Sequence, residues 1–327
     1  MWRSINRPRS PVSPVSPFIV VKTLKGSPKF ADVVSWNIQH LHGTTASQDR
    51  IEKIAEYMEA FRCDFWGLQE VEAAAVGRLV QAINARGNLK YSFLAVNGSG
   101  QQSACVFRTD TTLVKVLKPD PGMFDGRLEV VKKGKKVKSP VFAREPLLCS
   151  VRVKQSQGKV FDFRCAVVHT KSTDPNLKDK GTSLRQEASR VLGKWVSDGL
   201  KTGSERDFLV MGNMNAEQAN QGLEAFAKRK NMKLLSVGMK EKHGTKGDSG
   251  AITRFVSGRF LDHIAITSDS VALMPPSDEK EQIIVRSDIS VEGFTTPLNG
   301  SVGAFQQFEF SDHLPVAVRF VLGADHD

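Results

Sequence analysis

The stretch ADVVSWNIQHLHGTTASQDRIEKIAEYMEAFRCDFWGLQEV, residues 31–71, decides the fold class of this chain. The apolar run at 31–37 predicts a strand, and the run at 65–71 predicts another. Between them, apolar residues at helical spacing from Ile51 to Phe61 predict an amphipathic helix that starts near Ser47. This is a β-α-β opening, the unit from which α/β folds are built.

The rest of the chain contains a second predicted helix and further predicted strands. A capping box formed by Ser183 and Gln186 predicts the start of a second helix, with an apolar stripe from Leu184 to Trp195. Further strands rich in Val, Phe and Ile are predicted at 104–108, 146–153, 160–169, 208–211, 260–267 and 314–322. Strands outnumber helices, so we expect packed sheets flanked by helices in one domain over 31–323.

Composition sets the broad class. The 327 residues carry 46 basic and 35 acidic side chains, a net charge of +11, which favours a polyanionic partner such as nucleic acid. The four cysteines are widely spaced, so we expect reduced thiols and an intracellular setting. No apolar stretch approaches the roughly 18 to 20 residues of a membrane-spanning helix. Protein partners are not indicated.

Two segments have a biased composition. Residues 1–30 repeat a Ser-Pro unit without an acidic residue, which predicts a disordered basic arm; residues 324–327 are a short tail. The prolines argue against a transit peptide, and no apolar region of a secretory signal is present. Five lysines stand within 132–138, and they predict either a solvated hairpin tip or a phosphate-contacting loop.

Polar side chains follow several of the predicted strands, where loops tend to gather catalytic groups. Each alone is an ordinary cap, turn or satisfied polar residue, but together they suit metal-assisted phosphodiester hydrolysis. They are Asn37, Glu70, His169, Asn213, Asn215, Asp312 and His313.

Hydrolysis of this kind needs a hard cation, a water-activating group and donors for the developing charge. Glu70 and Asp312 are the carboxylates available for Mg²⁺, with Mn²⁺ as the alternative, and Asn37 is a neutral oxygen donor. His313 would activate water if Asp262 held its other ring nitrogen. His169 and Asn215 would donate hydrogen bonds to the phosphoryl oxygens.

These segments resemble the endonuclease/exonuclease/phosphatase superfamily, the DNase I-like fold, in its nuclease branch. Six motifs carry the resemblance in the family's order over 31–322: SWNIQHL at 35–41, GLQEVE at 67–72, VVHTKS at 167–172, GNMNAE at 212–217, LDHIAIT at 261–267 and SDHLPV at 311–316. The resemblance implies a four-layer α/β sandwich of two packed mixed sheets, with the active site at one rim.

The resemblance also implies roles for the residues. Glu70 would be the main ligand of a divalent metal, helped by Asn37 and Asp312. His313 and Asp262 would form a His-Asp pair, and His169 with Asn215 would bind the scissile phosphate.

One position departs from the family pattern. The family motif is Gly-Asp-x-Asn, whose Asp orients or deprotonates the attacking water, whereas this chain has Asn213. An amide keeps the shape of a carboxylate but takes no proton. Either the protein is a weakened or inactive relative, or Asp was replaced to stop turnover in a form made for structural work. Because the other motifs are intact, we favour the replacement.

Local features guide the choice of substrate. VFAREPLLCSV resembles the Arg-Glu-Pro segment of DNase I-like nucleases, which would make Arg144 a phosphate contact; the alternative is an ordinary surface Arg. On the helix after VVHTKS, Arg185 and Gln186 are expected to be solvated. The lysine-rich loop suits a phosphate backbone through Lys132, Lys133, Lys135 and Lys136.

We therefore expect a DNA endonuclease of low sequence specificity, active with an aspartate in place of Asn213 rather than as written. The alternatives are a phosphomonoesterase or phospholipid phosphodiesterase of the same superfamily, and a nucleic-acid-binding relative without turnover. The sequence does not decide between DNA and RNA.

Overall fold

The computed structural model describes residues 26, 30–43, 46–96, 100–154, 158–216, 223, 232–235, 261–267, 283–285, 311, 313 and 315–322. Structural statements below concern these residues. The predicted arm at 1–30, apart from Gly26 and Phe30, and the tail at 324–327 lie outside them, so the domain boundaries stay predictions.

Two six-stranded sheets form the centre of the fold. The first has the order β13 (Ile283–Val285), β14 (Val316–Val321), β1 (Phe30–Leu41), β2 (Phe65–Val71), β4 (Gln102–Arg108) and β3 (Tyr91–Ala95). The second has the order β11 (Met232–Leu234), β12 (Asp262–Thr267), β10 (Phe208–Asn213), β9 (Val160–His169), β8 (Leu147–Lys154) and β5 (Thr112–Val116). Both sheets mix parallel and antiparallel pairs, as predicted.

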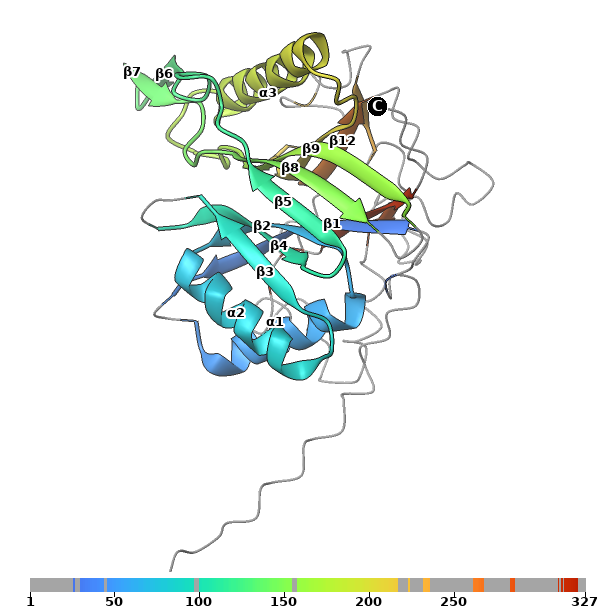
Figure 1. The fold of residues 1–327 in the computed structure, drawn as a ribbon. Helices are drawn as coiled ribbons and strands as arrows, with labels where there is room; N and C mark the ends of the chain where they lie inside the picture. Colours follow the sequence, from blue (N-terminus) through green and yellow to red (C-terminus); the bar gives the residue numbers. More distant parts are fainter. Residues whose placement is uncertain are drawn as a thin grey trace, which may run out of the picture.

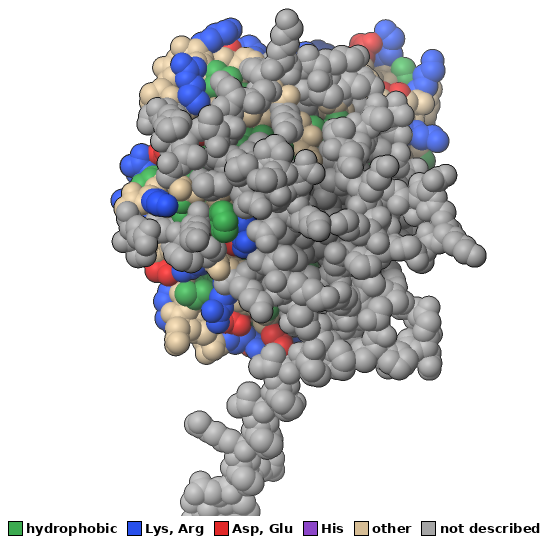
Figure 2. All heavy atoms as spheres, turned by 90° about the vertical axis from the view of Figure 1, so that its right-hand side faces the viewer, with side chains coloured by type: hydrophobic (Ala, Val, Ile, Leu, Met, Phe, Trp, Pro, Cys, Tyr) green, Lys and Arg blue, Asp and Glu red, His purple; other side chains and the backbone are tan. Residues whose placement is uncertain are grey.

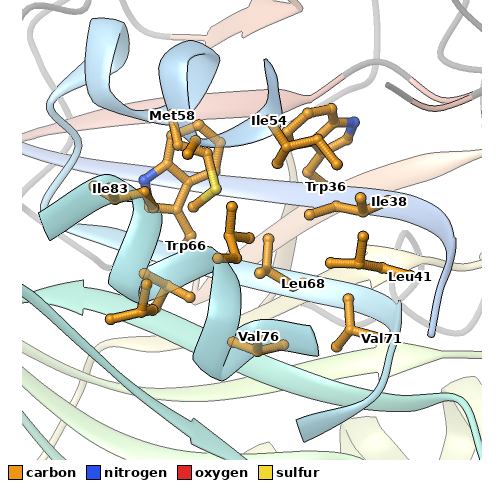
Figure 3. Close-up of a cluster of buried hydrophobic side chains, with 14 of the residues drawn as sticks. Trp36, Ile38, Leu41, Ile54, Met58, Trp66, Leu68, Val71, Val76 and Ile83 are labelled. Carbon is orange, nitrogen blue, oxygen red and sulfur yellow. The ribbon is translucent and has the colours of Figure 1, made fainter. Parts of the chain in front are cut away.

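The three helices among the described residues cover the outer faces of the sheets. Figure 1 shows α1 (Gln48–Phe61) and α2 (Ala73–Arg86) against the first sheet and α3 (Thr182–Thr202) beside the second. Figure 3 shows the apolar layer between the first sheet and its helices, where Trp36 of β1 and Trp66 of β2 meet Ile54 and Met58 of α1. A second buried layer joins the sheets, and a third lies under α3. The predicted four-layer α/β sandwich is confirmed.

A glycine sets the spacing where the sheets face each other. A Cβ on Gly67 of β2 would lie 2.3 Å from Cε of Met211 on β10 and 3.0 Å from Cγ2 of Val167 on β9. Because close-packed interiors have no room for an added methyl group, the sheets approach here only over glycine. Gly67 is thus a point of close contact between β2 of the first sheet and β9 and β10 of the second.

The β-α-β opening is confirmed, since β1 and β2 are parallel and α1 lies between them in sequence. Ser47 caps α1 by accepting a hydrogen bond from the backbone N–H of Arg50 at 3.1 Å. The predicted capping box at Ser183 is wrong. Gly181 occupies the cap of α3, and Asp179 accepts the N–H of Ser183 at 2.8 Å. The carboxylate of Asp179 thus accepts a hydrogen bond at the start of α3, the capping role that we predicted for Ser183.

All four cysteines are buried and free. No helix among the described residues is both long and apolar enough to cross a membrane. Figure 2 views the molecule from the right-hand side of Figure 1, and Lys and Arg side chains recur along the margins of that face.

Candidate active site

Three of the predicted site residues form one row across the second sheet. β9 and β10 are parallel, with His169 opposite Asn213, while β10 and β12 are antiparallel, with Asn213 opposite Asp262. Neighbouring strands lie about 4.8 Å apart. The sheet therefore holds His169, Asn213 and Asp262 side by side at its rim.

Gly212 explains how the chain reaches Asn213. Residues other than glycine rarely adopt its φ of 145°, and a Cβ there would lie 1.9 Å from the carbonyl oxygen of Val168. Beyond it, the Oδ1 atom of Asn213 accepts the backbone N–H of Asn215 at 2.9 Å. The amide of Asn215 donates to the carbonyl of Thr170 at 3.0 Å, which ties this turn to the residue after His169.

The first sheet contributes Asn37 and Glu70. Nδ2 of Asn37 donates to Oε1 of Glu70 at 3.1 Å. The strand register shifts between Gln69 and Val71, and Glu70 itself has a φ of 60°. Bulges of this kind redirect a side chain at a sheet edge, and strained residues of this type concentrate at functional sites.

Glu70 also makes a polar contact between the two sheets. Its Oε1 lies 3.6 Å from Nε2 of His169, and its Oε2 accepts the backbone N–H of His40 at 3.3 Å. Burial alone would raise the pKa of Glu70, but the charge that His169 carries in the acid range and the hydrogen bond from the Asn37 amide outweigh burial and lower it. Glu70 is therefore an ionised carboxylate at neutral pH.

His169 is held neutral. Burial, and next the positive charge of Arg144, lower its pKa to about 4. Its Nδ1 atom is buried without a hydrogen-bond partner among the described residues. A neutral imidazole is suited to donate one hydrogen bond to an anionic ligand rather than to pair with it as a cation.

His313 and Asp262 form the predicted pair. Nδ1 of His313 lies 2.6 Å from Oδ2 of Asp262, and both residues are buried. Because a carboxylate only accepts, Nδ1 carries the proton and Nε2 keeps its lone pair.

The segment around His313 is fastened to β1. The hydroxyl of Ser311 donates to the carbonyl of Asn37 at 2.6 Å and accepts the N–H of His313 at 3.0 Å. Nε1 of Trp36 donates to the carbonyl of His313 at 2.9 Å. Asp312 lies outside the described residues, so its predicted role stays a prediction.

The donors present fit a divalent metal at Glu70. No group of three or more His, Cys, Asp or Glu side chains among the described residues is arranged to hold a metal by itself. Mg²⁺ usually needs only one or two carboxylates, completed by waters and substrate phosphate oxygens. The ionised Glu70, anchored by Asn37 and partly open to solvent, supplies such a carboxylate.

Arg144 lies half-buried in the loop before β8. Its Nε and Nη2 atoms donate to the backbone carbonyl and to Oε1 of Gln101, at 3.0 and 2.8 Å. The amide of Gln101 also contacts Nδ1 of His40. Neither Gln101 nor His40 was among the predicted site residues. Only the three-dimensional contacts single them out, because nothing in the SWNIQHL motif marks the ring of His40 and the residues around Gln101 form no motif.

The predicted lysines lie on a hairpin of β6 (Arg127–Lys132) and β7 (Lys135–Pro140). The hairpin packs on the loop that follows His169, where Val130, Leu177 and Leu184 form a small cluster. Lys132 and Lys136 pair with Asp174 and Glu129 at 3.8 and 2.9 Å. Within the described residues, none of Lys132, Lys133, Lys135 and Lys136 contacts the row or Glu70.

Arg185 corrects another expectation. We predicted a solvated helix residue, but its side chain is buried. Its guanidinium donates to the carbonyls of Lys171 and Lys180 at 3.2 and 3.3 Å and to the hydroxyl of Thr182 at 3.2 Å. Arg185 therefore shapes the loop between His169 and α3.

Comparisons with known proteins concern the fold and the family of the chain. No curated protein sequence matches the chain. Among solved structures, the human Nocturnin catalytic domain is 15% identical, with coverage of 90% of this chain and 94% of that one and a TM-score of 0.51. A Bacteroides thetaiotaomicron mannosyl-6-phosphatase is 17% identical (89% and 99% covered, TM-score 0.53). Danio rerio TDP2 complexed with single-strand DNA product is also 17% identical (89% and 98% covered, TM-score 0.51).

These structural similarities show that the chain shares its fold with the three proteins. A family model matches residues 34–313, which span every described residue of the row and its neighbours. Members of that family act on phosphoester bonds and typically depend on a divalent metal. The chain belongs to the Endonuclease/Exonuclease/phosphatase family.

Proposed function

We propose that this protein is a divalent-metal-dependent phosphodiesterase that hydrolyses nucleic acid, DNA in the first place, and that Asn213 leaves the chain as written with little or no turnover. One observation carries the proposal. His169, Asn213 and Asp262 lie in one row, with His313 bound to Asp262 and Glu70 facing His169 from the other sheet.

Each residue of the candidate site has its own role in the proposed reaction. When bound at Glu70 and Asn37, with Asp312 as a further ligand, Mg²⁺ or Mn²⁺ supplies a Lewis acid for the phosphate. The neutral His169 and the amide of Asn215 donate hydrogen bonds to phosphoryl oxygens. His313, oriented by Asp262, exchanges a proton through Nε2. Residue 213 positions the attacking water.

Asn213 accounts for the expected lack of turnover. Its side chain is buried between its two partner strands and accepts a hydrogen bond through Oδ1. An amide in this place still positions a water molecule but cannot remove its proton. Aspartate has nearly the same shape, so Asn213→Asp is the direct test of a disabled hydrolase.

Charge supports nucleic acid as the substrate. The chain has a net charge of +11, and its lysine hairpin is fixed to the loop that follows His169. A phosphate backbone is the ligand for which such a surface gives affinity. The DNA product in the TDP2 structure of the same fold is consistent with this choice.

A phosphomonoester is the second candidate substrate. The mannosyl-6-phosphatase of the same fold favours it. Release of inorganic phosphate without cleavage of an oligonucleotide would distinguish this activity. Binding of nucleic acid without any turnover is the third outcome.

The experiment is a nicking assay on supercoiled plasmid, with Mg²⁺ and with EDTA, comparing the chain as written with Asn213→Asp. Asn88→Asp, an exposed position after α2, controls for the added charge. We expect cleavage only by Asn213→Asp and only with metal. If neither form cleaves plasmid, single-stranded DNA or RNA while both bind them, the hydrolase proposal for nucleic acid fails.

A further inference from the structure

Two loops meet at the rim, one from each sheet. Arg144 lies in the loop before β8, and Gln101 lies directly before β4. Nε of Arg144 donates to the backbone carbonyl of Gln101 at 3.0 Å, and Nη2 donates to Oε1 of the same residue at 2.8 Å. A guanidinium from the second sheet is thus bound twice by one residue of the first. The proposed reaction leaves Gln101 without a role.

The loop that carries Arg144 is anchored in the core. Phe142, two residues earlier, is buried in the apolar layer under α3, where its ring packs edge-on against Phe124. Pro146, two residues later, is also buried, whereas Arg144 is half-buried. The fold therefore fixes the backbone of this loop and leaves Arg144 partly open to solvent.

The two bonds to Gln101 use one edge of the guanidinium. Nε–H and one N–H of Nη2 point in the same direction and form the fork that binds two acceptors side by side. Two such bonds fix the plane of the group, whereas a single bond would leave it free to rotate. The opposite edge of the Arg144 guanidinium carries Nη1, which has no hydrogen-bond partner among the described residues. Gln101 therefore holds this open edge in one direction.

The contact lies beside the candidate metal carboxylate. The amide nitrogen of Gln101 contacts Nδ1 of His40, and the backbone N–H of His40 donates to Oε2 of Glu70 at 3.3 Å. Arg144, Gln101 and Glu70 therefore belong to one line of contacts along the rim. A cation held beside a metal-binding carboxylate suits a ligand that brings its own negative charge, and a phosphate is such a ligand.

Gln101 holds the guanidinium without neutralising it. An amide oxygen accepts a hydrogen bond but carries no net charge, so Arg144 keeps its full positive charge for a ligand. A carboxylate in the same place would bind the guanidinium more tightly but would repel a phosphate. The neutral side chain of Gln101 thus fits a residue that orients a phosphate-binding arginine.

We propose that Gln101 is a positioning residue for substrate binding, which holds Arg144 so that the open edge with Nη1 donates to a phosphate oxygen of the nucleic acid. The identity of this ligand rests on the proposed function. The contact between Gln101 and Arg144 depends neither on turnover nor on a bound metal. Immobilising a flexible side chain on binding costs affinity roughly two- to tenfold, and a guanidinium that is held in advance avoids that loss.

The first experiment observes the guanidinium of Arg144 directly. A mobile guanidinium rotates about its Nε–Cζ bond and averages its Nη–H signals, whereas a held one gives separate signals in ¹H–¹⁵N spectra. Arg144→Lys identifies the signals. We expect separate Nη–H signals in the chain as written and averaged signals in Gln101→Leu. Gln81→Leu, at an exposed position of α2, is the matched control and should change nothing.

Gln101→Glu is the conservative variant. Its carboxylate still accepts from Nη2 of Arg144, so separate signals should persist, whereas the added negative charge should weaken binding of an oligonucleotide. Averaged signals in the chain as written, or separate signals that survive in Gln101→Leu, overturn the positioning role of Gln101.

The second experiment is a double-mutant cycle on binding of a single-stranded oligonucleotide to the chain as written. We expect Arg144→Ala to weaken binding at least about tenfold, and Gln101→Leu to weaken it roughly two- to tenfold. In the Arg144→Ala background, Gln101→Leu should add less than about twofold. An equal loss in both backgrounds overturns the proposal, because Gln101 would then act through His40 or through the fold.

The outcomes separate this inference from the proposed function. Equal losses in the cycle overturn the inference even if Asn213→Asp cleaves DNA. If Asn213→Asp cleaves nothing, the proposed function fails, and the cycle still tests Gln101 through binding. If neither form binds an oligonucleotide, inorganic phosphate replaces it as the probe. A selective shift of the Arg144 Nη–H signals with phosphate, weaker in Gln101→Leu, would support the anion contact, and no shift would overturn it.

Discussion

The Oδ1 atom of Asn213 accepts a hydrogen bond from the backbone N–H of Asn215 at 2.9 Å. An aspartate at this position keeps that bond through one oxygen and leaves the other to accept a proton from water. We expect Asn213→Asp to raise turnover of DNA by about 10²- to 10⁴-fold. Rates of plasmid nicking with saturating Mg²⁺ measure the gain.

The same substitution should reduce stability. Asn213 is buried next to Asp262, and Glu70 lies across the rim, so a new charge there is poorly solvated. In EDTA we expect the free energy of unfolding to fall by about 1 to 3 kcal/mol. Denaturant unfolding of both forms measures this, and an unchanged midpoint would contradict the burial of residue 213.

Glu70 and His313 should be indispensable in the restored enzyme. Adding Glu70→Ala removes the described metal carboxylate, and adding His313→Ala removes the proton-exchanging imidazole. Each should lower turnover at least about 10³-fold. Glu72→Ala is the control, because Glu72 contacts His42 and Gly43 instead of the row. Normal turnover in either site variant would contradict the site assignment.

The lysine hairpin should contribute affinity but not catalysis. Changing all five lysines of 132–138 to Gln should weaken DNA binding and flatten its salt dependence by about 0.9 in slope for each lost duplex phosphate contact. The fold should persist, because Val130 and Leu177 remain packed. Binding measured over a series of salt concentrations gives the slope.

The matched control for the hairpin removes the same number of charges from other exposed positions. These are Lys115, Lys118, Lys154, Lys159 and Lys201. If both sets of substitutions change the slope equally, the hairpin is only a solvated tip.

Asp64 lies at the opposite end of β2 from Glu70. Its carboxyl group should make the stability of the fold depend on pH. Burial, only partly offset by the hydrogen bond from Asp32 N–H, raises its pKa to about 6. The folded state therefore binds the Asp64 proton more tightly than the unfolded state. This stabilisation is present below pH of about 4 and is lost as pH rises through about 6, with a total on the order of 3 kcal/mol.

Denaturant unfolding across this pH range tests the prediction. Asp64→Asn should flatten the fall in stability, whereas exposed Asp125→Asn should not. The comparison uses the slope with pH, because Asp64 also accepts hydrogen bonds from Asp32 N–H and the Thr111 hydroxyl at 2.9 and 2.8 Å. An identical slope in Asp64→Asn would contradict the raised pKa.

We expect Gly212→Ala to lower the free energy of unfolding more than Gly134→Ala does. The new Cβ meets a backbone carbonyl at 1.9 Å in a conformation with positive φ, so we expect a loss above about 3 kcal/mol. Gly134→Ala in the hairpin turn has positive φ but open space, and should cost about 1 kcal/mol. Thermal or denaturant unfolding compares the two.

Sequence alone identified the parts of this fold that are governed by local rules. Apolar runs located β2 and β9 residue for residue, and Ser47 marked the cap of α1. Helix α2 and the short or exposed strands, such as β5, were missed. Strand β5 has a weak apolar pattern because it lies at the edge of its sheet, with Leu113 and Val116 exposed.

The site was predictable where polar residues end buried strands, as Asn37 and His169 do. It was not predictable where contacts depend on a bulge or on distant loops. His40 reaches the rim because Gln39 and His40 both adopt positive φ, and Gln101 meets it from 61 residues away. Arg144 was predicted by resemblance, but its partner Gln101 was not.

The fastening of His313 to β1 has a consequence for synthesis of the chain. Trp36 and Asn37 emerge from the ribosome early, whereas Ser311, His313 and their strand β14 emerge almost 280 residues later, and β14 then pairs with β1. A nascent chain that already holds Glu70 and His169 therefore still lacks the imidazole held by Asp262. The candidate site is therefore complete only after β14 has been made and has paired with β1.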